Sequence, residues 1–159
     1  MPGPLSLFLQ QDHARLEELL RRATASSEID LESFRLFRAG LLRHIAMEEK
    51  VLLPEARRRR NGEPLPLAAR LRADHATLAA LLVPPPRREI IELIRGVLGQ
   101  HNPLEEGHGG VYQACEQLVG REQEALIVRL RAVPEVRVAA YFDGPAAHAN
   151  IERLLRARD

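Results

Sequence analysis

The stretch Leu41-Leu42-Arg43-His44-Ile45-Ala46-Met47-Glu48-Glu49-Lys50-Val51-Leu52-Leu53-Pro54 decides the expected fold, because its apolar residues recur at a helical spacing. It lies within a periodic segment that runs from about Leu31 to Arg60. His44 and Glu48 are four residues apart, so their side chains project from one face of the helix. We expect Pro54 to kink this helix, since proline has no N–H to donate and its ring crowds the preceding turn.

Three further amphipathic segments surround this helix in the sequence. They run from Leu5 to Arg22, from Pro64 to Leu82 and from Arg87 to roughly Leu118. Short polar turns or a run of prolines separate the four segments. This pattern predicts an all-α protein, an up-down-up-down four-helix bundle in which neighbouring helices are antiparallel.

The composition agrees with one all-α domain. The chain has 159 residues, 45% of them hydrophobic but only 4% aromatic, and Leu, Ala, Arg and Glu dominate. Its 23 Lys and Arg residues nearly balance 22 Asp and Glu residues, which leaves a formal charge of +1. A dedicated nucleic-acid binder would carry a strong positive excess, so no nucleic-acid partner is expected.

The expected location is the cytoplasm. Cys115 is the single cysteine, which excludes an intramolecular disulfide framework. No apolar run approaches the ~20 residues that a membrane span requires, so no membrane partner is expected. The start, Met1-Pro2-Gly3-Pro4, lacks the basic region of a secretory signal.

Residues after the fourth segment form a second unit in this interpretation. We expect residues 1–120 to form the bundle and residues 121–159 to form a C-terminal helical extension, with helices near Glu122–Leu130 and Ala146–Ala157. The extension would pack on the bundle or on a second protomer, which would make a homodimer. His148 lies in this tail, and we expect it not to be a primary metal ligand.

Two halves of the chain resemble each other. Asp12-His13-Ala14-Arg15-Leu16 recurs as Asp74-His75-Ala76-Thr77-Leu78, and the segment from His44 to Glu48 recurs, in the same order, from His101 to Glu105. The matching order and nearly equal offsets suggest a duplicated helical hairpin. A pseudo-twofold bundle would bring the two copies face to face.

Six residues of the two copies fall on apolar helix faces, and we predict that they bind metal: His13, His44, Glu48, His75, His101 and Glu105. An inward-facing glutamate is costly unless a partner or a cation neutralises it, and no equally inward Arg or Lys is evident. Carboxylates that bridge two ions in a bundle core are typical of di-iron and di-manganese proteins, whereas structural zinc more often recruits cysteine. The residues therefore favour a di-iron or di-manganese site over zinc, and we expect two non-haem iron ions (Fe2+/Fe3+), with manganese or zinc as the less favoured metals.

Each motif taken singly has an ordinary structural explanation. A lone histidine on an apolar face is usually a core residue that a neighbour satisfies, and a His and Glu four apart usually form an exposed helix pair. A helical interaction module without metal therefore stays an alternative. The repetition of the motifs in register on four helices favours the metal site.

The order His13, His44-Ile45-Ala46-Met47-Glu48, His75 and His101-Asn102-Pro103-Leu104-Glu105 resembles the hemerythrin-like HHE cation-binding domain family over about Leu5 to Leu118. Glu49 and Leu53-Pro54 are similar to the context that follows the first motif in that family. The resemblance implies a four-helix bundle with a non-haem di-iron centre. It also implies bridging carboxylates from Glu48 and Glu105, terminal imidazoles from the four histidines, and a bare position on one iron for O2, peroxide or NO.

The chain departs from this family pattern at two places. Ala79 stands where the oxygen-carrying members have another histidine, which leaves one iron short of a ligand. His108 could supply it, since it continues the face of His101 and Glu105, or it could be a loop residue among glycines. Pro103 either remains within a helix or begins a new one after Asn102, and in both cases we expect the second half-site to be the less regular one.

The leading hypothesis for function is a di-iron protein that binds or senses O2 or a related small molecule such as NO or peroxide. The enzymatic alternative uses the same centre to act on ferrous iron, peroxide or NO, or to deliver iron for cluster repair. Tyr112 could donate a hydrogen bond at the centre, although packing is the commoner role of a tyrosine in a bundle. The sequence assigns no catalytic residue.

Overall fold

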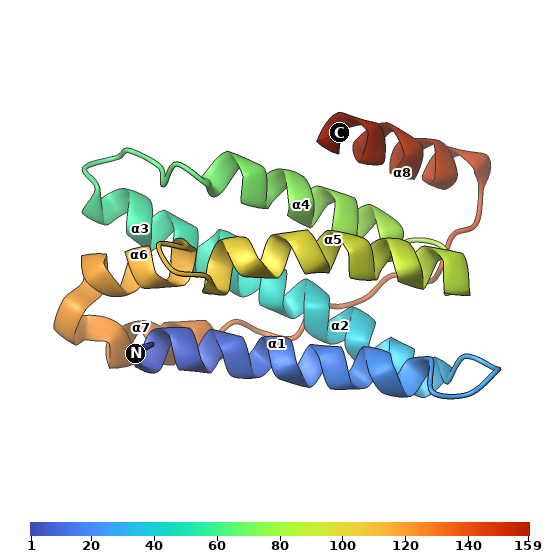
Figure 1. Cartoon of the computed structure of the whole chain (residues 1–159), viewed down its shortest axis with the longest axis horizontal. Helices are drawn as coiled ribbons and strands as arrows, with labels where there is room; N and C mark the ends of the chain where they lie inside the picture. Colours follow the sequence, from blue (N-terminus) through green and yellow to red (C-terminus); the bar gives the residue numbers. More distant parts are fainter.

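The computed structural model describes residues 1–159 and is all-helical, which confirms the predicted fold class. Four antiparallel runs of helix form the bundle (Figure 1). They are α1 (Pro4–Ala23), α2 (Leu31–Met47) continued by α3 (Leu53–Arg59), α4 (Ala68–Leu81) and α5 (Arg88–Glu106). After the bundle come α6 (Val111–Val119), a 3₁₀ turn (Gly120–Glu122), α7 (Gln123–Arg131) and α8 (Pro145–Arg158).

Local sequence signals explain where the first helices begin. Pro4 occupies the first turn of α1, where a missing N–H costs nothing. Asp30 caps α2, because its carboxylate accepts hydrogen bonds from the backbone N–H groups of Glu32 and Ser33. These two helices lie side by side over their length, and their inner faces begin the core.

The long second helix is interrupted by a π-helical turn, Glu48–Leu52, directly before Pro54. The Leu53 N–H donates to the Glu48 carbonyl, five residues back instead of four. A wider turn at this point relieves the crowding that the Pro54 ring would cause, and Pro54 itself falls in the first turn of α3. The expected kink therefore takes the form of a π turn that begins at Glu48.

The fourth helix is shorter than the sequence predicted. It ends at Glu106 instead of near Leu118, and α6 begins at Val111 after a turn rich in glycine. Gly109 has a φ of 75°, and a Cβ on Gly110 would lie 2.7 Å from the Leu104 carbonyl oxygen, so both positions need glycine. Pro103 remains inside α5, which decides between the two alternatives for this residue.

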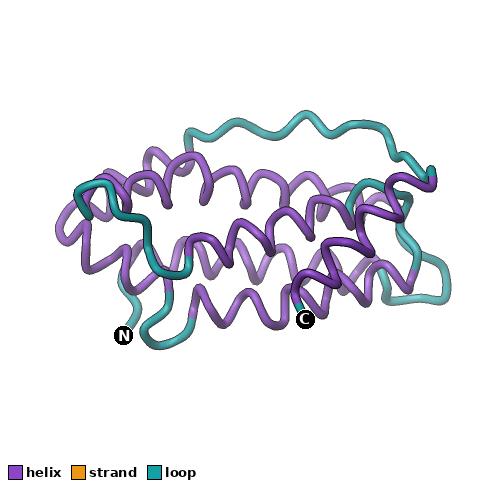
Figure 2. Tube along the Cα trace, turned by 90° about the horizontal axis from the view of Figure 1, so that it is seen from above, coloured by secondary structure: helices purple, strands orange, loops and turns teal.

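The C-terminal segments lie on opposite sides of the bundle. The helix α7 packs beside α1, and α8 packs along α4. A segment without regular structure, residues 132–144, joins them and runs along the length of the bundle (Figures 1 and 2). The division into units 1–120 and 121–159 and the homodimer stay predictions.

The core consists of two apolar clusters. One surrounds Leu9, Leu71 and Tyr112, and the other surrounds Leu16, Leu78 and Phe37. Leu9 and Leu16 both lie on α1 but belong to different clusters, and the same is true of Leu71 and Leu78 on α4. The layer between the clusters therefore falls at the middle of these two helices. The six ligands predicted from the helical motifs lie in that layer.

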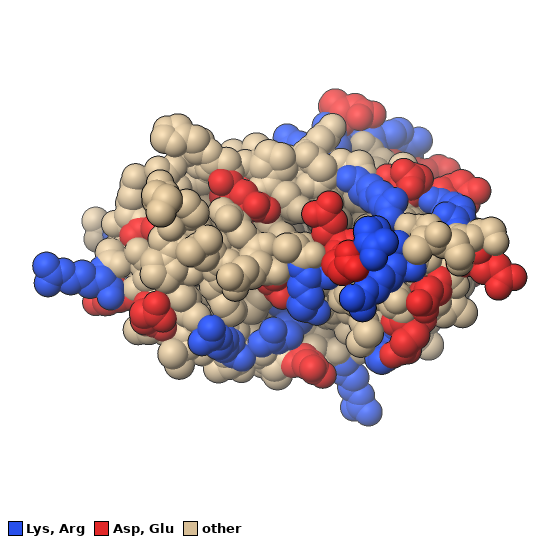
Figure 3. Space-filling model, turned by 60° about the horizontal axis from the view of Figure 1, so that its bottom comes forward, with Lys and Arg blue, Asp and Glu red and all other residues tan.

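The surface carries interspersed acidic and basic side chains on the face shown in Figure 3. Many of them pair within one helix, as Arg21 does with Glu18 and Arg35 with Glu32. None of the helices combines the length and the apolar character that crossing a membrane would require.

Candidate metal centre

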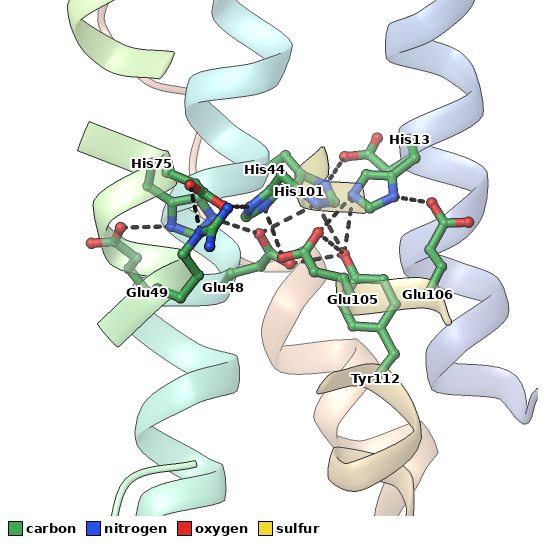
Figure 4. A network of polar contacts seen from close by, with 12 residues as sticks. His13, His44, Glu48, Glu49, His75, His101, Glu105, Glu106 and Tyr112 are labelled. Atoms are coloured by element: carbon green, nitrogen blue, oxygen red, sulfur yellow. Dashed lines mark hydrogen bonds and ion pairs between the residues drawn. The ribbon is translucent and has the colours of Figure 1, made fainter. Parts of the chain in front are cut away.

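Four helical runs contribute one buried polar layer at the middle of the bundle (Figure 4). All six residues that the sequence predicted as ligands of the helical motifs are buried and lie together there: His13 on α1, His44 and Glu48 at the end of α2, His75 on α4, and His101 and Glu105 on α5. Each of these side chains points to the interior because it replaces an apolar residue in the helical repeat.

The ligand atoms of the layer form two groups of four. One group consists of His13, His44, Glu48 and Glu105, and the other of Glu48, His75, His101 and Glu105. Within each group the candidate ligand atoms all lie within 4.8 Å of one another. The two groups share Glu48 and Glu105, which is the arrangement that carboxylates bridging two ions require.

Every histidine of the layer donates a hydrogen bond from Nδ1 to a carboxylate. His44 donates to Asp12 over 2.8 Å and His101 to Asp74 over 2.9 Å. His13 donates to Glu106 over 2.5 Å and His75 to Glu49 over 2.7 Å. Such carboxylates fix the tautomer and the ring orientation of a metal-binding histidine. The four Nε2 atoms are therefore left facing the two shared glutamates.

These four carboxylates follow the sequence repeat. Asp12 and Asp74 each precede a histidine of their own helix but bind the histidine of the neighbouring helical run. Glu49 and Glu106 each follow a shared glutamate directly. The sequence reasoning missed this outer set, although its recurrence in both halves was the available signal.

Several polar atoms at the centre have no hydrogen-bond partner. They are Oε1 of Glu48, Oε2 of Glu105 and Nε2 of His75, all buried. The Nε2 of His75 is 3.2 Å from Oε1 of Glu48, yet the geometry is not that of a hydrogen bond. Buried polar atoms without partners are costly, so atoms that converge in this way fit a cation.

The electrostatics of the layer point in the same direction. Burial alone would lower the pKa of His44, but the charge of Glu48 and the hydrogen bond to Asp12 raise that pKa to about 10. Burial would raise the pKa of Glu48, but the charge of His44 and the close approach of the His44 and His75 imidazoles hold that pKa well below its usual range. Both shifts indicate that the protein stabilises positive charge between the two shared glutamates.

Tyr112 is the site residue that the sequence reasoning undervalued. Its hydroxyl donates to Oε2 of Glu48 over 2.8 Å and lies 3.1 Å from both Oε1 of Glu105 and Nε2 of His13. Burial and the two carboxylates raise the pKa of the phenol well above its usual value. Tyr112 therefore does more than pack in the core, because its hydroxyl contacts candidate ligands of the first group.

The structure does not bring His108 to the centre. It lies exposed on the turn between α5 and α6 and belongs to neither group of four. The break after Glu106 removes it from the face that carries His101 and Glu105, and Tyr112, further along the chain, is the residue that contacts Glu105. His148 is far along the chain on α8, where it pairs with Asp143.

The expectation of a less regular second half-site is wrong. His101, Pro103 and Glu105 all lie in the continuous helix α5. The irregular backbone is in the first half-site, where the π turn begins at Glu48. Pro54 lies just after this turn, and the wider π turn relieves the crowding that its ring would cause.

A groove of about 840 Å³ reaches the centre from the surface between α1 and α5. All four histidines and Glu48 line its floor, and apolar residues such as Leu16, Leu20 and Leu98 line its walls. Arg21 and Arg95 also belong to its lining. The groove therefore leads from the surface toward the buried layer.

The comparisons with known proteins agree with this geometry. The family model described as hemerythrin HHE cation binding domain matches residues 6–108, which include all six candidate ligands of the helical motifs. No curated protein and no solved structure matches the chain. By the extent of this match, the chain belongs to the hemerythrin HHE cation binding domain family.

Proposed function

We propose that the protein holds two non-haem iron ions in this layer and uses them to bind or sense O2 or a related small molecule such as NO or peroxide. The observation that supports it best is the pair of four-residue groups that share Glu48 and Glu105. His13 and His44 would hold one ion and His75 and His101 the other. The shared glutamates would bridge both.

The ligand types support iron as the cation. Imidazole and carboxylate together suit iron in the core of a helical bundle, and no cysteine joins the layer. The buried Cys115 is not a member of either group. Manganese would accept the same carboxylate bridge, so metal analysis has to distinguish the two.

The residues around the ions would control what binds there. Iron in the ferrous state would supply electrons to a small oxidising ligand. Tyr112 would hold its hydroxyl beside the position that His13 and His44 flank, within 3.3 and 3.1 Å of the Nε2 atoms of His44 and His13. The apolar walls of the groove would exclude much of the water while leaving a path for an uncharged diatomic molecule.

Absorption spectra of the iron-loaded protein, recorded anaerobically and then with O2 or NO, test this proposal. We expect a band that appears with the ligand and disappears when the ligand is removed. Iron-loaded protein that shows no ligand-dependent band would contradict a binding or sensing role.

An enzyme that acts on peroxide or NO is a second candidate, and the volume of the groove favours it. A carrier needs only a narrow path, whereas a groove of about 840 Å³ has room for solutes larger than a diatomic molecule. Tyr112 would then hold a proton close to the reacting ligand.

Turnover measurements separate the two candidates. The enzymatic role predicts catalytic consumption of peroxide or NO by the iron-loaded protein, and loss of that turnover in Glu48→Ala. Reversible binding without turnover would support the binding role. If protein purified without a histidine tag binds no metal, both candidates fail and the helical interaction module remains.

A further inference from the structure

The two halves of the centre differ in the side chains that contact their outer aspartates, Asp12 and Asp74. Asp12, which accepts the hydrogen bond of His44, also accepts two hydrogen bonds from Arg15 of its own helix, at 3.0 and 2.9 Å. In the second copy of the repeat Thr77 stands where Arg15 stands in the first. Thr77 bonds instead to the carbonyl of Ala73. The second repeat therefore has no guanidinium at the matching position.

The missing guanidinium comes from α8. Arg158 forms an ion pair with Oδ1 of Asp74, while Oδ2 of the same carboxylate accepts the hydrogen bond of His101. A second contact, from Arg158 to Oε1 of Gln100 over 2.9 Å, holds the guanidinium between α4 and α5. Arg158, Asp74 and His101 thus form one chain of contacts that ends at a candidate metal ligand.

The ion pair of Arg158 with Asp74 is shielded from solvent, unlike the ion pair of Arg15 with Asp12. The side chain of Asp74 is 0% exposed and that of Arg158 is 10% exposed, whereas Arg15 is 49% exposed. Arg70 also donates a hydrogen bond to Oδ1 of Asp74 over 3.3 Å, but its side chain is 46% exposed. A buried carboxylate depends strongly on its partners, because solvent cannot replace them. Arg158 is accordingly the main partner of Asp74.

The position of α8 is fixed by contacts far from the centre. Ile151 is buried in the core cluster around Leu16 and Leu78, with Leu154 and Leu155 packed against it. The preceding segment is held by the Arg38 guanidinium, which donates to the Ala139 carbonyl, and by the ion pair of Arg87 with Asp143. The docking of α8 therefore carries Arg158 to Asp74.

We propose that Arg158 is a positioning residue for the second half of the metal centre, which acts through Asp74 to orient His101. The C-terminal helix then completes one half of the centre, and its docking sets the affinity of the ion that His75 and His101 hold. This inference rests on the proposed function in that it takes His101 as a ligand. Substitution of an outer partner of a metal-binding histidine weakens metal affinity by roughly 10- to 100-fold.

Anaerobic Fe2+ titration against a competing chelator tests the proposal with three variants. In Arg158→Ala we expect one of the two ions to bind at least about tenfold more weakly while the other is unaffected. Arg158→Lys keeps a cation and should recover most of that loss. Arg156→Ala, an exposed arginine of the same helix, is the matched control and should bind both ions as the unaltered chain does.

Two results of the titration would overturn the proposal. Arg158→Ala could bind both ions with unchanged affinity, or it could weaken both ions equally. Ile151→Ala shows what loosening of α8 as a whole does, because it removes the buried anchor without touching Asp74. A drop in melting temperature in Arg158→Ala as large as that of Ile151→Ala would assign Arg158 a merely structural role.

A readout without metal separates this inference from the proposed function. If the unaltered chain binds no iron, the proposed function fails, and the ¹⁵N signals of the His101 imidazole in metal-free protein then decide the inference. We expect Arg158→Ala to shift the His101 signals and to leave those of His44 unchanged. Unchanged His101 signals would contradict the contact chain itself.

Discussion

The hydroxyl of Tyr112, on α6, donates a hydrogen bond over 2.8 Å to Oε2 of Glu48, the first residue of the π turn that follows α2. This contact connects a helix outside the four-helix bundle to one of the two shared glutamates. Because the same hydroxyl also lies 3.1 Å from Oε1 of Glu105, it contacts both carboxylates of the layer.

Tyr112→Phe removes the hydroxyl while keeping the ring in the core. We expect the metal-free protein to lose about 1–3 kcal/mol of unfolding free energy, because hydrogen bonds to buried charged groups are lost. Chemical denaturation measures the change. Tyr141→Phe is the control, since Tyr141 is exposed and its hydroxyl makes no hydrogen bond. Equal stability of the two variants would mean that the Tyr112 hydroxyl contributes nothing to the layer.

Glu48→Gln and Glu49→Gln distinguish a shared carboxylate from an outer one. Glu48 belongs to both groups of four, so its loss of charge should abolish the binding of both iron ions. Glu49 contacts only His75, and its substitution should weaken one ion by roughly 10- to 100-fold. Iron content after gel filtration measures both effects. Equal losses in the two variants would show that Glu48 is not shared.

Much of the layer was predictable from the sequence, and the reason is periodicity. A histidine or glutamate that interrupts an apolar stripe marks a buried polar position on a helix, so His13, His44, His75 and Glu105 could be placed on inner faces. The repeat also indicated that the two copies would face each other. The structure gathers these residues as that pattern required.

The remaining parts depend on geometry that local patterns do not encode. Tyr112 reaches the centre only because α5 ends before the Gly109–Gly110 turn and the chain then changes direction. The residues of α6 that face the centre therefore do not continue the helical repeat of α5. Asp12 and Asp74 bind histidines of the neighbouring helix, so the pairing needs the helix packing. The π turn at Glu48 likewise depends on how the chain resolves the crowding at Pro54.

The groove can be narrowed by a larger side chain at its wall. Leu98→Trp should leave the iron content unchanged but slow the binding of NO or the reaction with peroxide, since Leu98 lines the groove. Stopped-flow absorption measures the association rate. Leu93→Trp is the matched control, because Leu93 is exposed on the same helix and does not line the groove. Equal rates in both variants would indicate another route to the centre.

The pH dependence of stability can be tested at Glu55, which connects α3 to Arg129 of α7. Hydrogen bonds from Arg58, only partly opposed by burial, hold the pKa of Glu55 at about 2. A carboxyl whose pKa is lower in the folded chain stabilises the fold above its unfolded pKa of about 4.5, and this stabilisation is lost as the pH falls toward 2.

Glu55→Gln should therefore be less stable than the unaltered chain at pH 7, and the difference should shrink as the pH falls from about 4.5 to 2. Denaturant unfolding at a series of pH values measures it. The exposed Glu124 of α7 provides the control variant, Glu124→Gln. A difference that stays constant over this pH range would show that the Glu55 charge does not stabilise the fold.

The iron content of the protein, purified without a histidine tag and loaded anaerobically with Fe2+, tests the central claim most directly. The two groups that share Glu48 and Glu105 predict two iron ions per chain, lost together in Glu48→Gln. A single ion per chain, or two ions that survive the loss of Glu48, would contradict a centre in which that carboxylate joins both ions.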